Sequence, residues 1–415
     1  MSHDALTALR DDPIDWRYKG FPDRPGVTVG TVGDQHWSLL AGDLPTPALV
    51  LKEAALAHNL ELMRLYCDAR GVSLAPHGKT TMSPQLIARQ FQAGAWGITA
   101  ANVAQVRVFR HFGFERIVLA NECVEPRSVR WLADELERDP GFDFYCLVDS
   151  VAAVRAMEAA LAGGVARRIQ VLVELGFEGG RTGARTLQDA HEVARAATAS
   201  PVLEVAGVEG YEGILHGDDL ADVLGEVDRF LDGIRELLLG LRLEREEAVV
   251  TAGGSAFFDH VCERLGDLPA RLVLRSGCYV THDSEFYEHL SPLGGRSAGG
   301  PRLRPALQAF GAVLSRPEPE LALLLLGKRD VSFDISLPVP ECVVSRGELR
   351  DATGMRIVEL NDQHAYVRLP AGDPLAVGDL VGCGISHPCT TFDRWRLIPV
   401  VDDSFEVVDA VHTFF

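Results

Sequence analysis

The sequence predicts an α/β protein with a parallel (β/α)8 barrel at residues 44–295, similar in plan to a TIM barrel, and a following β domain at residues 296–415. In the first region, short apolar runs alternate with amphipathic stretches, which is typical of buried parallel strands joined by helices. Residues 292–305 are rich in Gly, Pro, Ser and Arg and indicate a domain boundary. Beyond it only short strand-like runs follow. A doubly wound sheet is the alternative for the first domain.

The predicted elements follow one another along the chain. Residues 1–43 form a polar lead-in without a readable motif, and we expect them to pack on the β domain. Buried strands of the first region are predicted at 47–51, 72–75, 97–101, 116–120, 142–148, 169–175, 205–210, 248–251 and 271–274. Amphipathic helices are predicted between several of them, for example at 151–161 and 220–239. Strands of the β domain are predicted at 307–314, 321–326, 339–344, 356–360, 365–369, 380–383 and 395–400.

Composition and charge argue against several classes of function. The formal net charge of −19 over 415 residues argues against a nucleic-acid partner, because phosphate backbones require clustered Lys and Arg. No run of eighteen apolar residues occurs, so we expect no membrane-spanning helix. The first residues lack the basic and apolar regions of a signal peptide, and we expect a cytoplasmic protein. The eight cysteines form no C-x-x-C pair and are expected to be free thiols.

The stretch Val72–Asn102 carries the first candidate for chemistry. Its apolar alternation predicts a short strand that ends at Pro76, and Ser83 followed by Pro84 predicts the start of a helix. Lys79 therefore follows the C-terminal end of a strand in a βαβ unit, where parallel barrels carry their catalytic loops. A lysine in this place is either a solvated cation or an amine that forms a Schiff base with a carbonyl group.

Other loops at predicted strand ends carry residues suited to a ligand. Gly253, Gly254 and Ser255 directly follow a predicted strand. Such a turn binds phosphate through its amides and hydroxyl group, or it is an ordinary Gly-Gly turn. In an earlier loop, two glycines before Arg181 indicate a constrained turn that presents the guanidinium; the alternative is a surface arginine. Tyr211 also follows a predicted strand and is either a ligand contact or a packed aromatic residue.

The segment after the last predicted barrel strand is a further candidate. Gly277 would let the backbone approach a phosphate, and in an extended segment Tyr279 would project from the same face. The alternative is a strand end with a packed aromatic side chain. Cys278 is expected to be a packed thiol, because nothing nearby in the sequence marks it as an activated nucleophile.

Near the C-terminus, His387 and Cys389 stand two residues apart. In an extended segment their side chains would project from one face and could share one metal ion. Imidazole with thiolate suits Zn²⁺, and so few protein ligands would leave coordination positions open for a substrate. By itself, H-x-C is a weak signal for a metal site, and two buried structural residues are the more common explanation.

Together these motifs resemble those of the fold-type III pyridoxal-phosphate (PLP) enzymes, and among them the D-serine dehydratase and D-threonine aldolase group. The resemblance rests on Pro76–Thr80 and on the Gly-rich and Arg-Thr-Gly segments downstream, and it covers the chain from about Leu44 to the C-terminus. It implies an alanine racemase-like barrel in which Lys79 is catalytic and holds PLP. It also implies cofactor contacts from His77, Arg181, Tyr211, Gly253, Gly254, Ser255, Gly277 and Tyr279.

The resemblance also implies a metal and a reaction. D-serine dehydratases carry His-x-Cys as zinc ligands in this place, whereas aldolases of the group more often carry His-x-Asp. His387 and Cys389 are therefore expected to bind Zn²⁺ or another divalent ion, and Cys389 favours dehydration. The implied enzyme, a PLP-dependent ammonia-lyase, converts a D-3-hydroxy amino acid such as D-serine or D-threonine to a 2-oxo acid and ammonia. Ala75, Thr81 and Met82 depart from residues that are frequent in the family, which bears on the substrate.

Alternative functions come from the same resemblance. D-threonine aldolase-type cleavage to glycine and an aldehyde uses the same lysine, cofactor and metal. A non-catalytic PLP-carrier protein shares the barrel fold, but its single-domain relatives lack a β domain that would carry His-Pro-Cys. An alanine racemase-like enzyme would need no metal. The expected partners are a small D-amino acid substrate and a second copy of the chain in a homodimer, with no nucleic acid and no membrane.

Overall fold

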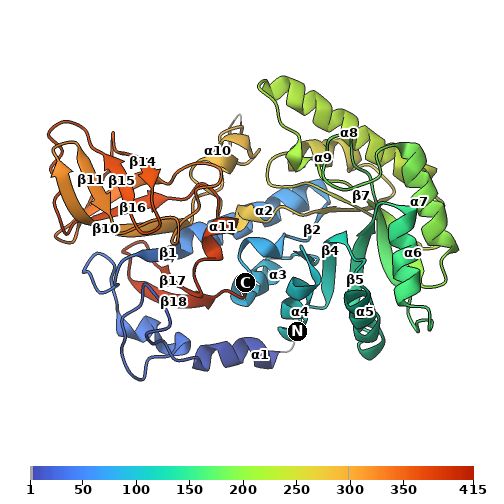
Figure 1. The fold of residues 1–415 in the computed structure, drawn as a ribbon, viewed down its shortest axis with the longest axis horizontal. Helices are drawn as coiled ribbons and strands as arrows, with labels where there is room; N and C mark the ends of the chain where they lie inside the picture. The colour runs from blue at the N-terminus through green and yellow to red at the C-terminus, as the bar shows by residue number, and fades with distance from the viewer. Residues whose placement is uncertain (1–2, 298) are drawn as a thin grey trace. The chain divides into compact units, whose positions relative to one another are not determined.

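The computed structural model describes residues 3–297 and 299–415. The chain divides into two compact units. The barrel unit contains Arg64–Lys79 and Gln90–Gly277, and the sheet unit contains the described part of Ser2–Met63 together with Thr80–Arg89 and Cys278–Phe415. Figure 1 labels the elements of both units.

The barrel unit is built on eight parallel strands, drawn mainly in blue-green to yellow in Figure 1. They are β2 (Ser73–Leu74), β3 (Ile98–Ala100), β4 (Arg116–Glu122), β5 (Asp143–Val148), β6 (Ile169–Glu174), β7 (Leu203–Glu209), β8 (Ala248–Ala252) and β9 (Ala270–Leu274). Their order is β2-β9-β8-β7-β6-β5-β4-β3. The two ends of this series join through a parallel bridge between His77 and Thr99 and a hydrogen bond from Thr99 N to Pro76 O (2.9 Å). The predicted barrel is therefore confirmed over the doubly wound alternative, because an open sheet would leave two edges unpaired.

Apolar side chains fill the barrel, and helices cover it. The buried cluster of the barrel contains Ala75, Val118, Tyr145, Leu147, Leu172, Ala206, Val249 and Val273. The helices that follow the strands are α4 (Val103–His111), α5 (Pro126–Arg138), α6 (Val151–Ala160), α7 (Leu187–Ala199), α8 (Leu220–Gly240) and α9 (Phe258–Leu265). In α5, Val129, Leu132 and Leu136 are buried on one face, as helical spacing requires. The helices α2 (Glu53–Arg70) and α3 (Pro84–Gln92) contain residues of both units.

The sheet unit contains ten strands, most of them antiparallel, which confirms the predicted C-terminal β domain. They are β1 (Ala48–Lys52), β10 (Leu307–Glu318), β11 (Leu321–Leu324), β12 (Val339–Ser345), β13 (Glu348–Asp351), β14 (Arg356–Leu360), β15 (Ala365–Arg368), β16 (Leu380–Gly384), β17 (Leu397–Val401) and β18 (Val407–His412). The main path is β13-β12-β16-β10-β1-β17-β18, and β11 attaches to β10. The run at 47–51, which the sequence grouped with the barrel strands, is thus β1 of this sheet. A fully buried apolar run has the same pattern in either sheet.

The lead-in contributes to the core of the sheet unit. It contains α1 (His3–Ala8) and the 3-10 turns η1 (Leu9–Asp11), η2 (Val29–Thr31) and η3 (Gly33–Gln35). Leu39 N donates to Phe405 O (3.1 Å), and Ser38 forms a bridge with Glu406. Lead-in residues such as Ile14 share one buried cluster with sheet residues such as Val407. Among the described residues, no helix has the length and apolar character needed to cross a membrane.

Candidate active site

Lys79 lies directly beyond β2, at the C-terminal ends of the barrel strands. His77 N donates to Arg275 O (3.1 Å), and the chain then forms the 3-10 turn η4 (Gly78–Thr80). Lys79 is exposed, and it is the only lysine among the described residues of the barrel unit. It therefore stands where barrels of this kind place catalytic side chains.

His77 supplies a buried nitrogen atom near Lys79. Its Nδ1 is buried and has no hydrogen-bond partner among the described residues. Burial lowers the pKa of His77 well below its usual value, and the positive charges of Lys79, Arg275 and Arg181 lower the pKa further. The imidazole is therefore neutral at pH 7, and a hydrogen bond to a bound ligand would satisfy Nδ1.

Arg181 and Tyr211 lie beyond the neighbouring strands β6 and β7. The Arg181 guanidinium carbon lies 5.3 Å from the centre of the Tyr211 ring, which is a cation–π distance. Sequence reasoning missed Arg185, which organises the Arg181 loop. The Arg185 guanidinium donates to the backbone carbonyl groups of Gly180, Arg181, Thr182 and Gly183. The loop backbone is therefore fixed while the Arg181 side chain stays exposed.

The glycine turn after β8 is paired within the barrel unit. Gly253 N and Gly254 N donate to the carboxylate of Glu212 at 3.1 and 2.8 Å. Gly253 has a φ of +88°, a conformation that favours glycine. Ser276 Oγ lies 3.2 and 2.8 Å from the carbonyl oxygens of Gly253 and Gly254. The two amides that were predicted to bind a phosphate are thus hydrogen-bonded to Glu212. Glu212 is fully buried, and sequence reasoning missed it. Ser255 is the next residue of this turn.

A buried ion pair between Arg275, which follows β9, and Glu209, which ends β7, adjoins this glycine turn. The side chains of Arg275 and Glu209 are 5% and 2% exposed and contact each other directly. Arg275 Nη1 also donates to Thr251 Oγ1 (3.2 Å), and Arg275 N donates to Gly253 O (3.0 Å). Burial raises the pKa of Glu209, while the Arg275 charge opposes the rise. Paired burial of this kind holds the two strand ends in one geometry.

The segment after β9 differs from the expected extended chain. Cys278–Val280 form the 3-10 turn η6. In such a turn, successive side chains are about 120° apart, so residues two apart do not share a face. The extended geometry expected for Gly277 and Tyr279 is therefore wrong. Gly277 is the last residue of the barrel unit, and Tyr279 is a buried residue of the sheet unit.

The segment at His387 and Cys389 is not extended either. Pro388 has helical backbone angles (φ −55°, ψ −41°), and Cys389 begins the short helix α11 (Cys389–Phe392). The two side chains nevertheless interact electrostatically, because Cys389 raises the pKa of His387. The helical turn at Pro388, and not the alternation of an extended strand, therefore sets the geometry between His387 and Cys389.

Asp334 orients His387 within the sheet unit. The His387 Nδ1 lies 2.7 Å from Asp334 Oδ2, and Thr390 Oγ1 donates to Asp334 Oδ1 (2.8 Å). Burial lowers the pKa of His387, but the Cys389 thiolate and the Asp334 carboxylate outweigh burial and raise it to about 9. With Nδ1 facing Asp334, Nε2 is the nitrogen that remains for a metal ion.

Cys389 has the lower pKa of two neighbouring cysteines. Its Sγ lies 3.5 Å from Cys278 Sγ and 3.4 Å from Thr80 Oγ1. The hydrogen bond from Cys278 holds the pKa of Cys389 well below its usual value, against the effect of burial, and His387 lowers it further. The same bond raises the pKa of Cys278. Cys278 is thus the packed thiol that the sequence predicted, and its raised pKa makes it the donor in the contact with Cys389.

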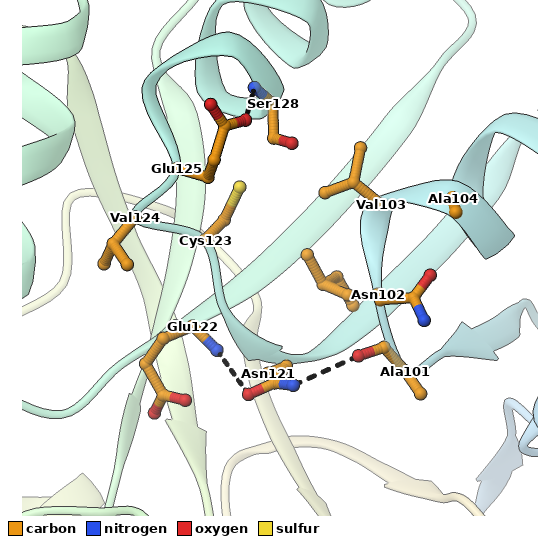
Figure 2. Close-up of a pocket in the computed structure, with 11 residues that line it drawn as sticks. Ala101, Asn102, Val103, Ala104, Asn121, Glu122, Cys123, Val124, Glu125 and Ser128 are labelled. Carbon is orange, nitrogen blue, oxygen red and sulfur yellow. Dashed lines mark hydrogen bonds between the residues drawn. The ribbon is translucent and has the colours of Figure 1, made fainter.

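A cavity of about 340 Å³ lies beyond β3 and β4 (Figure 2). Two segments form most of its lining: residues 101–104, which enter α4, and residues 121–125, which leave β4. Asn121 Nδ2 joins them by donating to Ala101 O (3.1 Å). Glu125 accepts hydrogen bonds from Arg127 N (3.0 Å) and Ser128 N (2.6 Å) at the start of α5. These amides are already bonded to a carboxylate, so this helix end is not suited to an anionic ligand.

Two family models match the chain. The model "Alanine racemase, N-terminal domain" matches residues 51–264, more than half of the 415 residues. The model "Putative serine dehydratase domain" matches residues 306–401. The chain belongs to the alanine racemase N-terminal domain family.

Relatives within the family are lyases of D-amino acids. The chain is 26% identical to a 3-hydroxy-D-aspartate aldolase of Paracoccus denitrificans (strain Pd 1222), over 78% of this chain and 80% of the relative. It is 35% identical to a D-threo-3-hydroxyaspartate dehydratase of Delftia sp. (strain HT23), over 34% of this chain and 36% of the relative. The fold is similar to that of D-threonine aldolase from Filomicrobium marinum, with a TM-score of 0.75, 24% identity, and coverage of 89% and 95%. The fold-type III PLP family that the sequence indicated is confirmed.

The barrel residues fit the cofactor of this family. The unit offers a single exposed lysine, a buried histidine nitrogen that lacks a partner, and a guanidinium beside a tyrosine ring. Lys79, His77, Arg181 and Tyr211 are the residues that would hold PLP. For its phosphate group, the amides of Gly253 and Gly254 would first have to leave Glu212.

The donor set of the sheet unit fits a metal ion. A thiolate and an imidazole are ligands that Zn²⁺ prefers, and the thiolate is the form that binds metals. The Asp334–His387 contact is the outer carboxylate contact typical of histidine ligands. Asp334 stands 53 residues before His387, so no local pattern in the sequence could connect them.

Proposed function

We propose that this protein is a PLP- and zinc-dependent dehydratase that converts D-3-hydroxy amino acids such as D-serine or D-threonine to a 2-oxo acid and ammonia. One observation carries the proposal: the Cys389 thiolate is paired with His387, whose ring is oriented by Asp334. A thiolate in this place favours a borderline-soft ion such as Zn²⁺ over Mg²⁺ or Ca²⁺. The relative from Delftia is a dehydratase by name, which supports the same reaction type.

The proposed roles of the residues follow from their positions. Bound PLP supplies an electron sink at Cα, and a bound divalent ion supplies Lewis acidity toward the 3-hydroxyl group. Lys79 Nζ would hold the cofactor and, once the substrate amine has replaced it there, would remove the Cα proton. Neutral His77 would donate or accept one hydrogen bond that fixes the orientation of the ring. Lys79 would reach only one face of the bound substrate, so a single enantiomer should react, and the names of the relatives favour the D-isomer. In the sheet unit, His387 Nε2 and Cys389 Sγ hold the ion.

An aldolase is the second candidate, because two of the relatives are aldolases by name. Products from D-threonine separate the two reactions. A dehydratase releases ammonia and 2-oxobutanoate, whereas an aldolase releases glycine and acetaldehyde. D-serine, D-threo-3-hydroxyaspartate and the L-isomers should be assayed in parallel. We expect ammonia as the main product from the D-isomers; glycine and acetaldehyde as main products would overturn the dehydratase proposal.

The cofactor lysine is tested separately from the reaction type. Borohydride should fix PLP on the peptide that contains Lys79, and Lys79→Ala should abolish turnover with the circular dichroism spectrum unchanged. The chain has three other lysines, all in the sheet unit, and Lys52→Ala serves as the control that keeps its cofactor. Labelling of Lys19, Lys52 or Lys328 in place of Lys79 would contradict the assignment.

A further inference from the structure

Three carboxylates gather at the C-terminal ends of three neighbouring barrel strands. Glu122 ends β4, Asp149 directly follows β5, and Glu174 ends β6. One oxygen of each lies within 4.8 Å of an oxygen of the other two. The order β6-β5-β4 in the closed sheet brings these strand ends side by side. In the described part of the chain, this is the one group of three His, Cys, Asp or Glu side chains that meets this spacing.

Glu174 provides a second observation that points to a ligand. The residue is only 3% exposed. Its Oε1 accepts a hydrogen bond from Thr182 Oγ1 (2.8 Å), but its Oε2 is buried and has no hydrogen-bond partner among the described residues. Glu122 Oε1 is in the same condition. Buried carboxylate oxygens without a partner cost free energy that a bound cation would recover.

We propose that Glu122, Asp149 and Glu174 bind a divalent cation, at a site distinct from His387 and Cys389. All three ligands are carboxylate oxygens, which Mg²⁺, Mn²⁺ and Ca²⁺ prefer, whereas the thiolate site suits Zn²⁺. Two oxygens on opposite sides of one such ion are about 4–5 Å apart, since each bond measures roughly 2.0–2.6 Å. The spacing of the three carboxylates meets that limit. Without an ion, burial and the negative charges of Glu209 and Glu122 raise the pKa of Glu174 to about 10, so a bound cation must displace a proton from this carboxyl group.

The cavity at β3 and β4 adjoins one of the three carboxylate residues. Glu122 is one of its lining residues, although its carboxylate points away from Cys123 in Figure 2. The Thr182 hydroxyl group bonded to Glu174 acts as an outer contact that fixes the carboxylate. The neighbouring carboxylate of Glu125 is bonded to the amides of α5 and does not belong to the three.

The test uses Mn²⁺, whose unbound fraction is counted by electron paramagnetic resonance. The full chain carrying His387→Ala and Cys389→Ala, loaded with PLP and stripped of metal, should still bind one Mn²⁺. Adding Glu174→Gln keeps the shape of the side chain but removes a ligand oxygen charge, and it should weaken Mn²⁺ binding at least tenfold. The bound is tenfold because even the loss of an outer contact weakens metal binding by about 10–100-fold. Glu125→Gln, a carboxylate in the same cavity lining, is the matched control and should leave Mn²⁺ binding unchanged.

A second route avoids any dependence on the double variant. Wild-type protein whose thiolate site is saturated with Zn²⁺ should take up one Mn²⁺, and the single variant Glu174→Gln should not. If neither protein binds Mn²⁺ while keeping its PLP absorbance, the proposed site does not exist. Equal Mn²⁺ affinity with and without Glu174→Gln would place the ion elsewhere. Neither result depends on whether the enzyme is a dehydratase or an aldolase.

Discussion

At the scale of single residues, two histidines are driven to opposite protonation states by their surroundings. His77 is half-buried, and the loss of solvent around its ring, together with neighbouring cationic side chains, lowers its pKa. His387 is half-buried too, but Cys389 and the Asp334 carboxylate raise its pKa to about 9. The first ring is therefore a neutral hydrogen-bonding group, and the second must lose a proton before it binds a metal ion. Charge contacts, and not burial alone, decide which role each histidine can take.

Asp334→Asn tests this account of His387. It removes the carboxylate charge, so the pKa of His387 should fall from about 9 toward its ordinary value, and Zn²⁺ affinity should drop about 10–100-fold. The folded pKa lies above the unfolded value of about 6.5, so the contribution of this charge to stability is complete below pH 6.5 and is lost as pH rises through about 9. In metal-free protein we expect Asp334→Asn to lower the free energy of unfolding by roughly 1 kcal/mol at pH 6, and this cost should fade by pH 10. The cost is small because the Asp334 side chain is partly exposed and solvent weakens the charge contact.

Urea unfolding at both pH values and an NMR titration of the His387 ring measure these effects. Asp362→Asn is the control, since Asp362 pairs with Arg329 on the exposed surface. A cost that stays constant from pH 6 to pH 10 would show that Asp334 acts by packing and not by charge.

At the scale of elements, the turn η4 depends on one glycine. A Cβ added to Gly78 would lie 2.5 Å from Phe109 Cζ and 3.1 Å from Ile98 Cγ1. Both neighbours are fully buried and cannot move aside easily. Gly78→Ala must therefore displace either the barrel core or the turn that carries Lys79.

We expect Gly78→Ala to lower the free energy of unfolding by about 1–3 kcal/mol, as overpacking does. Turnover should fall by about 100-fold, since a shift near 1 Å at the lysine has that effect. Urea unfolding and PLP loading, followed by absorbance, provide the measurements. Gly163→Ala is the matched control, because a Cβ there meets nothing within 4 Å. Wild-type stability and loading in Gly78→Ala would mean that the turn adapts.

The elements also show how far the sequence alone could lead. The strand before Lys79 and the helix start at Pro84 were predictable because local patterns define them. The sheet that β1 joins was not predictable, because an apolar run has the same sequence pattern whichever strands it pairs with, here β10 and β17. The helical start of α11 overrode the extended geometry expected around Pro388. Glu212 and Asp334 escaped notice because their partners are brought to them only by the folded chain.

At the scale of the whole molecule, each unit carries its own apolar core. The cluster in the barrel contains only barrel-unit residues, and the cluster that joins the lead-in to β17 and β18 contains only sheet-unit residues. His387 and Cys389 belong to neither cluster. We expect the proposed metal ligands to form an open catalytic site and not to hold the sheet unit together.

Removal of metal from the whole protein tests that conclusion. Dialysis against a chelator should abolish lyase activity while leaving the circular dichroism spectrum and the PLP absorbance intact, and added Zn²⁺ should restore activity. The free energy of unfolding should fall only by the loss of ligand binding, about 3 kcal/mol at 100 times the dissociation constant. Cys389→Ala should reproduce the loss of activity without rescue by Zn²⁺, whereas Cys262→Ala, a thiol of the barrel unit, should stay active. Full activity in protein verified as metal-free would return His387 and Cys389 to structural roles, and unfolding on chelation would make the ion structural.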